Sequence, residues 1–337
     1  MEAPQQDNKR RALLITGAIV WVPWLVLMAT RDQWGLFADN YFMSVTMVFG
    51  SFIAGATSEG GGAVAFPVMT LVFGITPAVA RDFSLIIQSV GMIAAGATIL
   101  WTRVPVVRGC LIWTSLGGSL GVILGLEFIA PLLPPPFAKM LFTSTWLAFA
   151  IALWMINRAR NRLVNDDLGE LNLRTKALLI VIGVIGGSVT AITGSGLDIL
   201  TFSLLVLVFR VSESVATPTS VILMGVNALV GAVYKGTLGA GLAAEAWNYW
   251  WVCVPVVVLG APLGAQFIRN RSRLFVARFL MISVVIQFVA ALIIVPQSPV
   301  LLAFSAAVFL LALGLFSFMG WLGRGNIPTP ITPATAN

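Results

Sequence analysis

Long apolar segments separated by short polar connections run through almost the whole chain. Eight of these segments are long enough to cross about 30 Å of hydrocarbon, which takes roughly 20 helical residues. The eight segments are residues 12–30, 83–101, 110–131, 137–156, 215–234, 247–268, 274–295 and 299–322. This pattern predicts an all-α polytopic membrane protein and argues against a soluble globular domain.

Two further apolar regions, 42–74 and 177–209, are each interrupted by a glycine-rich break. The breaks read Thr57-Ser58-Glu59-Gly60-Gly61-Gly62 and Thr193-Gly194-Ser195-Gly196-Leu197-Asp198. Each glycine costs a helix about 1 kcal/mol relative to alanine, and the pieces that follow, 62–74 and 197–209, reach only about 20 Å. We therefore predict two broken helical hairpins made of half-length helices, with their tips inside the membrane. Whether each is re-entrant or a pair of complete short spans stays open.

The basic residues predict the orientation of the chain, because cytoplasmic loops carry an excess of Lys and Arg. The basic clusters are Lys9, Arg10 and Arg11; Arg103 and Arg108; Arg158, Arg160, Arg162, Arg174 and Lys176; Arg269, Arg271 and Arg273; and Arg324. The loops between these clusters are 31–41, 75–82, 132–136, 235–246 and 296–298, and they hold few basic residues. We expect a multi-pass protein of the cytoplasmic (inner) membrane with both termini in the cytoplasm. The two breaks then enter the membrane from opposite faces.

The two halves of the chain match each other after a shift of 136 residues. The matching pairs are Thr57 and Thr193, Gly60 and Gly196, Phe66 and Phe202, Ala80 and Ala216, and Ser84 and Ser220. Each half holds one hairpin and three spans, so the second copy is expected to be inverted, as in many secondary transporters. The predicted parts are the N-terminal tail, first span and outer loop (1–48), repeat 1 (49–156), a solvated cytoplasmic loop (157–176), repeat 2 (177–295), the last span (296–323) and a disordered C-terminal tail (324–337).

The doubled order of these motifs resembles the TauE/SafE family of sulfite exporters, also known as toluene sulfonate uptake permease-like transporters. The first copy reads Ser58-Glu59-Gly60-Gly61-Gly62, Pro67 and Ala80-Arg81-Asp82-Phe83-Ser84, and the second reads Gly194-Ser195-Gly196-Leu197-Asp198, Ser203 and Val215-Ala216-Thr217-Pro218-Thr219-Ser220. The resemblance extends from about Phe49 to Val295. It implies export of sulfite or small organosulfonates. Glu59 stands where the family usually has an apolar residue, and Leu197-Asp198 stands where it has two glycines.

The amino-acid composition limits the partners and cofactors that can be expected. Hydrophobic residues make up 58% of the 337 residues and charged residues 10%, against about 25% charged residues in soluble domains. The net charge of +7 follows from the basic loops, so no nucleic-acid partner is expected. The chain has no histidine and two cysteines, so no metal, cofactor or disulfide framework is expected. The expected partners are a small anion and the lipid bilayer, and a homodimer is one alternative for the oligomeric state.

The breaks are the candidate substrate site. A helix that begins after a break presents unpaired N–H groups and the positive end of its dipole, which suits a small oxyanion. The candidate substrate-binding residues are Thr57, Ser58, Gly60, Gly61, Gly62, Thr193, Gly194, Ser195, Gly196, Gln88 and Asn227. Alternatively, the glycines only permit close helix packing, and Gln88 and Asn227 only join helices by hydrogen bonds.

Charged residues within the apolar regions suggest roles in transport. A carboxylate at the bilayer centre costs about 2.5 kcal/mol or more, so we hypothesise that Glu59 and Asp198 carry a proton that is coupled to anion movement. Alternatively, each accepts hydrogen bonds from amides of the broken helices and is structural. Arg81 and Asp82 are expected in the turn after the first half-helix, as a local ion pair or with an arginine that attracts substrate. Lys139 is expected to extend to the membrane surface.

The combined pattern predicts a secondary transporter of a small sulfur-containing or organic anion, most simply an exporter driven by protons or membrane potential. An anion channel built on the same broken helices, and an uptake permease for an organosulfonate, are the alternatives. An enzyme is not expected, because histidine is absent and no nucleophile motif occurs in context. The sequence leaves the anion, the direction and the coupling ion open.

Overall fold

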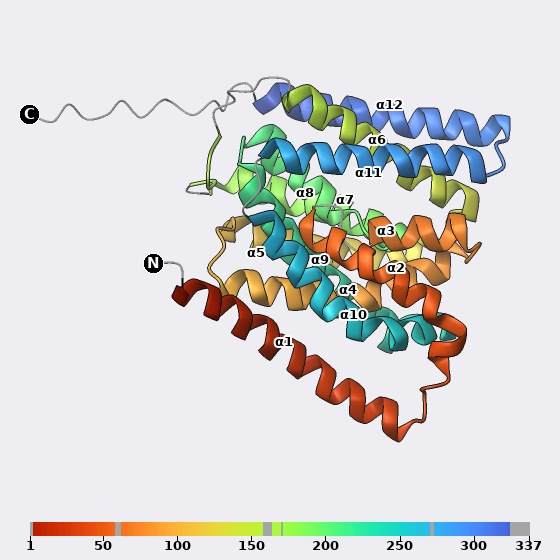
Figure 1. Ribbon diagram of the computed structural model, residues 1–337. Helices are drawn as coiled ribbons and strands as arrows, with labels where there is room; N and C mark the ends of the chain where they lie inside the picture. The colour runs from red at the N-terminus through yellow and green to blue at the C-terminus, as the bar shows by residue number, and fades with distance from the viewer. Residues whose placement is uncertain (1–2, 58–61, 158–163, 170, 270–272, 324–337) are drawn as a thin grey trace, which may run out of the picture.

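Helices account for the regular secondary structure of the computed structural model (Figure 1). It describes residues 3–57, 62–157, 164–169, 171–269 and 273–323. Within these residues no β-strand forms, and an isolated bridge joins Asn165 to Val211. The predicted C-terminal tail, 324–337, lies outside the described residues.

The α-helices are α1 (Ala3–Thr30), α2 (Leu36–Ala56), α3 (Gly62–Pro67), α4 (Pro77–Trp101), α5 (Arg108–Leu124), α6 (Pro135–Asn157), α7 (Leu173–Thr193), α8 (Leu197–Ser203), α9 (Glu213–Thr237), α10 (Ala244–Arg269), α11 (Arg273–Ile294) and α12 (Pro299–Leu322). Three π-helical turns, η1 (Val68–Val72), η2 (Gly125–Ile129) and η4 (Leu204–Val208), continue α3, α5 and α8, and a 3-10 turn, η3 (Ala130–Leu132), follows η2.

Eight of the described helices are long and apolar enough to cross a membrane, which confirms the predicted all-α polytopic class. They are Leu36–Ala56, Pro77–Trp101, Arg108–Leu132, Pro135–Met155, Leu173–Thr193, Glu213–Thr237, Ala244–Phe267 and Pro299–Leu322. Helices α1 and α11 cover the other two predicted spans, 12–30 and 274–295.

The two hairpins have unequal arms, which corrects the expectation of two half-length helices in each. The first arms, α2 and α7, have 21 residues each and reach about 31 Å, the length of a full crossing. Helix α2 begins at Leu36 and includes Asp39 in its first turn, where a carboxylate favours the helix dipole. Helix α7 begins at Leu173 because the Asn172 side chain accepts a hydrogen bond from the Thr175 N–H at 2.8 Å, a typical N-cap.

The second return arm begins at Leu197, as the sequence predicts, and the first is described from Gly62. The first consists of six α-helical residues and a five-residue π-helical turn, and the second of seven and five. They end at Val72 and Val208 rather than at 74 and 209. Both arms span less than about 18 Å and are too short to cross the hydrocarbon alone.

Small residues bring the first arm of each hairpin very close to a helix of the other half. Helix α2 packs along α10, and α7 packs along α5. A Cβ atom on Gly55 of α2 would overlap the carbonyl oxygen of Ala261 in α10, and one on Gly121 of α5 would overlap that of Val184 in α7. Glycines at such positions let the helix backbones touch, as is usual between membrane helices.

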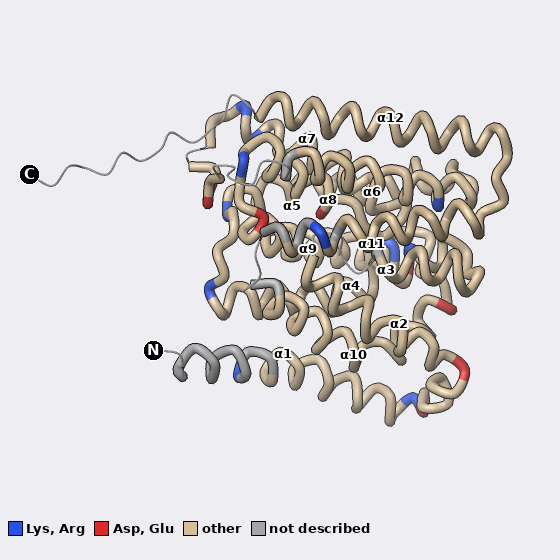
Figure 2. Tube along the Cα trace, turned by 45° about the horizontal axis from the view of Figure 1, so that its top comes forward, with Lys and Arg blue, Asp and Glu red and all other residues tan. Residues whose placement is uncertain are grey.

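Both described ends of the chain lie at the same end of the bundle, since α1 begins and α12 ends there (Figure 1). Figure 2 shows most of the Lys and Arg residues toward this end. Helix α4 ends and α5 and α7 begin at this end, which places Arg103, Arg108, Arg174 and Lys176 here. Helices α4 and α6 begin and α9 ends at the opposite end, with Arg81, Lys139 and Lys235. We call the opposite end the α4-start end.

The connection between α6 and α7 is anchored to the protein at Asn165, and the solvated cytoplasmic loop over 157–176 stays a prediction. The Asn165 N–H donates to the Arg210 carbonyl at 2.8 Å, and the Asn165 carbonyl accepts from the Ser212 N–H at 2.9 Å. The Asn165 side chain also donates to the Phe209 carbonyl at 2.9 Å. The connection therefore holds the turn that follows the second half-helix.

Candidate functional site

The second break is a buried turn between α7 and α8. Helix α7 ends at Thr193, and Gly194 adopts the left-handed conformation with φ +80°. A Cβ atom at this position would also collide with the side chain of Ser84 in α4. Glycine is therefore required twice, for the backbone conformation that ends the helix and for the close approach of α4.

The start of α8 already holds a carboxylate. Asp198 is 1% exposed, and its Oδ2 accepts a hydrogen bond from Ser195 Oγ at 2.9 Å. Its Oδ1 accepts from the Gly196 N–H at 2.8 Å. The positive end of the half-helix is thus occupied by a side chain of the protein. This agrees with the alternative in which Asp198 accepts hydrogen bonds from the broken helix and has a structural role.

The threonine hydroxyls at this break serve the turn itself. Thr193 Oγ1 donates to the Ser195 carbonyl at 2.6 Å, and Thr190 Oγ1 accepts from the Leu197 N–H at 3.1 Å. Thr190 was not a sequence candidate, although it lies one turn before the break. Together these bonds fix the geometry of the donors that surround Asp198.

Gln88 connects the second break to α4. Its Nε2 donates to the Gly194 carbonyl at 2.7 Å and to the Ser84 carbonyl at 3.0 Å. The side chain is buried. The structure therefore brings the predicted site residue Gln88 directly to the break, across a sequence separation of 106 residues.

Asn227 of α9 is also brought near the second break. Its Oδ1 lies against Gly118 of α5, and Gly118 in turn lies against Leu197, the first residue of α8. Asn227 is 1% exposed, and within the described part of the chain neither its Oδ1 nor its Nδ2 has a hydrogen-bond partner. An unsatisfied buried amide is costly, so this side chain is suited to receiving a ligand or a water molecule.

The first break lies only partly within the described residues. Thr57 is buried at the end of α2, and its Oγ1 donates to the Ile53 carbonyl at 2.9 Å. The predicted site residues Ser58, Glu59, Gly60 and Gly61 lie outside the described residues, and α3 begins at Gly62. The roles assigned to these residues stay predictions.

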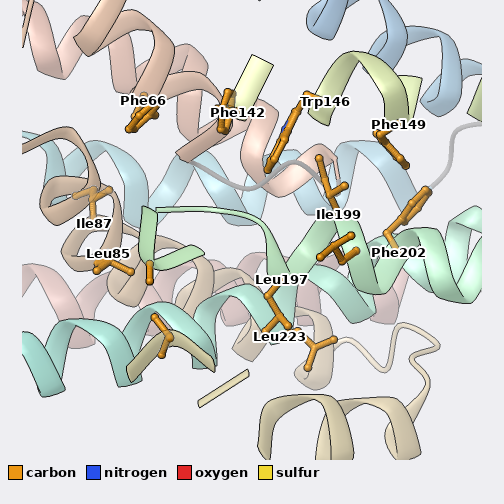
Figure 3. Close-up of a cluster of buried hydrophobic side chains, with 14 of the residues drawn as sticks. Phe66, Leu85, Ile87, Phe142, Trp146, Phe149, Leu197, Ile199, Phe202 and Leu223 are labelled. Carbon is orange, nitrogen blue, oxygen red and sulfur yellow. The ribbon is translucent and has the colours of Figure 1, made fainter. Parts of the chain in front are cut away.

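Aromatic side chains of α6 contact both half-helices (Figure 3). The ring of Phe142 lies 5.4 Å from that of Phe66 in α3 and stacks on Trp146 at 4.2 Å. One turn further on, Phe149 lies 5.8 Å from Phe202 in α8. Sequence reasoning missed this connection, although positions 142, 146 and 149 have the spacing of one helix face. Helix α6 thereby links the two half-helices.

Three charged residues form a buried cluster at the α4-start end. Asp82 is 2% exposed and accepts hydrogen bonds from Arg81 Nε and Nη2, both at 3.1 Å. It also accepts from Lys235 Nζ of α9, and from the Ala243 N–H at 3.1 Å. The predicted local ion pair is confirmed. Its predicted place in the turn is wrong, because α4 begins at Pro77 and includes both residues.

Lys139 contacts the first half-helix, and its place at the membrane surface stays a prediction. Its Nζ donates to the carbonyl oxygen of Thr70 at 2.7 Å. Thr70 lies in the π-helical turn that continues α3, where the change of hydrogen-bond register leaves backbone carbonyls in need of donors. The ammonium group of α6 therefore holds the end of the first half-helix.

These features define a class: a polytopic α-helical membrane protein with two broken helices whose short arms pack inside the bundle. The model of the sulfite exporter TauE/SafE family matches residues 43–291, which is most of the chain. The protein therefore belongs to the TauE/SafE family, as the motifs of the two breaks predict. Comparison with curated proteins and with solved structures gives no match.

Proposed function

We propose that this protein is a secondary transporter that moves sulfite or a small organosulfonate across the cytoplasmic membrane. Family membership makes it a membrane transporter of sulfur anions. The eight apolar helices support its placement as a multi-pass protein. The identity of the anion, the coupling and the direction are the parts that we propose.

The observation that carries this proposal is the capture of the Asp198 carboxylate at the start of α8. The donors are the Gly196 amide and the Ser195 hydroxyl. Sulfite and sulfonates present the same charged oxygen acceptors, and a helix N-terminus stabilises such anions through its N–H groups and dipole. The donors that hold the carboxylate therefore suit the oxygen atoms of the substrate.

In the proposed mechanism, the substrate and Asp198 compete for these donors. Protonation of Asp198 removes its charge, so these donors become free for the incoming anion. One proton then moves with each anion. Divalent sulfite with one proton carries one net negative charge, which an inside-negative membrane potential drives outward by about 2.3 kcal/mol per 100 mV. Glu59 is proposed to share this proton at the first break.

Further residues are proposed to complete the site. The amide of Asn227, which is buried without a partner, supplies a donor beside α8. Gln88 sets the orientation of the second break through Gly194. The proposed donors and close-approach positions at the two breaks are Thr57, Ser58, Gly60, Gly61, Gly62, Thr193, Gly194, Ser195 and Gly196.

We further propose that the two halves are inverted repeats that alternate access to this site. The matched packing of α2 on α10 and of α7 on α5 supports the relationship, as do the π-helical turns that end both return arms. The basic residues at the end where α1 begins and α12 ends support cytoplasmic termini.

The test is flux into proteoliposomes, with sulfite, thiosulfate, sulfate, taurine, isethionate and sulfoacetate as substrates, with and without a pH gradient. We expect saturable flux of at least one sulfur anion that responds to the gradient. A linear, voltage-dependent conductance would favour the anion channel instead. The absence of flux for every anion would overturn the proposal.

A further inference from the structure

The charged cluster at the α4-start end joins three elements of the fold. Asp82 belongs to α4, Lys235 to the last turn of α9, and the Ala243 N–H precedes α10. Arg81 closes the cluster from within α4. One buried carboxylate therefore holds the end of α9 and the start of α10 against α4.

The cluster has an excess of positive charge. Within the cluster two cations share one carboxylate. A further carboxylate, Glu127 of η2, lies nearby, because its Oε1 approaches Gly239 in the turn that follows Lys235. The side chains of Arg81 and Lys235 are 12% and 13% exposed, whereas that of Asp82 is 2% exposed. Buried ion pairs are weak evidence for stability, because desolvation offsets much of the attraction. The excess of cations over carboxylates within the cluster is a property that an anion would sense.

The cluster lies next to the second break. Gly194 contacts the Arg81 carbonyl and the Ser84 side chain on the same face of α4, and Gln88, one turn further along α4, binds the Gly194 carbonyl. The cluster and the second break therefore lie at adjacent levels along α4.

The corresponding position in the other half carries no charge. A shift of 136 residues places the cluster on Thr217, Pro218 and Ile99. These three residues line a small cavity beside Gly55, at the end of α2. The cavity volume is about 10 Å³, which suits about one water molecule. Since a neutral arrangement serves at that position, the hairpin packing itself does not require the ion cluster.

We propose that Arg81 and Lys235 form a second anion-binding subsite on the path of the transported anion, with Asp82 as the counter-ion that the anion displaces. This inference rests on the proposed transport function. An anion that pairs with Lys235 weakens its contact with Asp82 and loosens α9 from α4, which opens the path. When the anion leaves, Asp82 recovers both cations and closes it. The bound anion can shift this equilibrium because it interacts with only one of the two states.

If the cluster is an anion subsite, removing one of its positive charges should raise KM, and removing its negative charge should lower KM. In sulfite flux measurements on the full-length protein in proteoliposomes, Lys235→Met and Arg81→Gln are expected to raise KM about tenfold, and Lys235→Arg to keep it near the wild-type value. Asp82→Asn is expected to lower KM about threefold or more, because the competing carboxylate is gone. The matched controls are Asp39→Asn and Arg31→Gln, exposed residues toward the same end of the bundle.

A purely structural cluster gives a different result. All cluster variants would then reduce the maximal rate and the unfolding temperature, with KM unchanged or shifted in one direction, and this would overturn the inference. If Asp82→Asn does not fold, equal KM values for Lys235→Met and Lys235→Arg would overturn it equally well. Wild-type protein without saturable flux of any anion would refute the transport function, whereas normal wild-type flux with unchanged variants would refute the subsite alone.

Discussion

Replacing Asp198 by Asn removes the charge from the second break while keeping its shape. In the wild-type protein the carboxylate accepts hydrogen bonds from Ser195 Oγ and from the Gly196 N–H, at 2.9 and 2.8 Å. Asn keeps one carbonyl oxygen for the Gly196 amide, and the hydroxyl of Ser195 can rotate to accept from the new amide group. The variant therefore imitates the protonated state of Asp198.

For anion binding, removing the charge that competes with the substrate outweighs the loss of one hydrogen bond. Two unit charges about 4 Å apart interact by about 4 kcal/mol at an effective dielectric constant of roughly 20. Even half of this energy, about 2 kcal/mol, changes the affinity for an anion by more than about tenfold. The cost to folding is about one charge-assisted hydrogen bond, about 1 to 3 kcal/mol. We expect Asp198→Asn to bind sulfite at least about tenfold more tightly and to lose the response of flux to a pH gradient.

The assay combines affinity and flux. Affinity follows from the rise in unfolding temperature with sulfite concentration, and flux is measured in proteoliposomes at fixed inner pH and stepped outer pH. Isethionate is run beside sulfite, because its sulfonate stays ionised throughout and its flux reports protonation of the protein alone. Asp39→Asn, an exposed carboxylate in α2, is the control. An Asp198→Asn protein that keeps the wild-type pH dependence would refute the proton role.

Three further substitutions test the packing that positions the site. Gly194→Ala places a methyl group against Ser84 at a positive φ, and we expect a loss of about 2 kcal/mol or more in unfolding free energy. Gly121→Val forces α5 away from the Val184 carbonyl of α7 and is expected to cost about 3 kcal/mol, read as a lower unfolding temperature. Gln88→Leu leaves the Gly194 carbonyl without its donor, costs about 1 to 3 kcal/mol, and is expected to reduce anion flux.

Gly320→Ala in α12 is the control for the glycine substitutions, because a methyl group there meets no atom within 4 Å. Wild-type stability in Gly121→Val would show that the close approach of α5 and α7 is dispensable. Full flux in Gln88→Leu would show that transport does not need the hydrogen bond between α4 and the second break.

The sequence determined the features that depend on local physical chemistry. Hydrophobic windows of about 20 residues identify membrane helices whatever surrounds them, so the all-α membrane class followed directly. Clusters of glycine end a helix for reasons of backbone entropy alone. The start of the second return arm, near Leu197, was therefore predicted, and the first return arm is described from Gly62, near its predicted start. The paired order of the motifs was also sufficient to indicate the TauE/SafE family.

Helix ends and charged contacts were predicted less well, because short-range polar groups decide them. The first arms extend to Leu36 and Leu173, beyond the apolar stretches, since polar side chains such as that of Asn172 stabilise a helix terminus in ways that hydropathy does not report. Lys139 was predicted to extend to the membrane surface, and its contact with the Thr70 carbonyl, in a π-helical turn of another element, was not foreseen. Such a turn has no clear signature in the sequence.

Only the tertiary structure decided which residues share a site. Gln88 meets Gly194 across 106 residues, and Lys235 meets Asp82 across 153. These pairings depend on the rotation and depth of each helix, which are set where small residues let two backbones touch, and no local pattern encodes them. The sequence alone identified the glycine breaks and the carboxylate of Asp198, and the packing of α4, α7 and α9 determined what surrounds them.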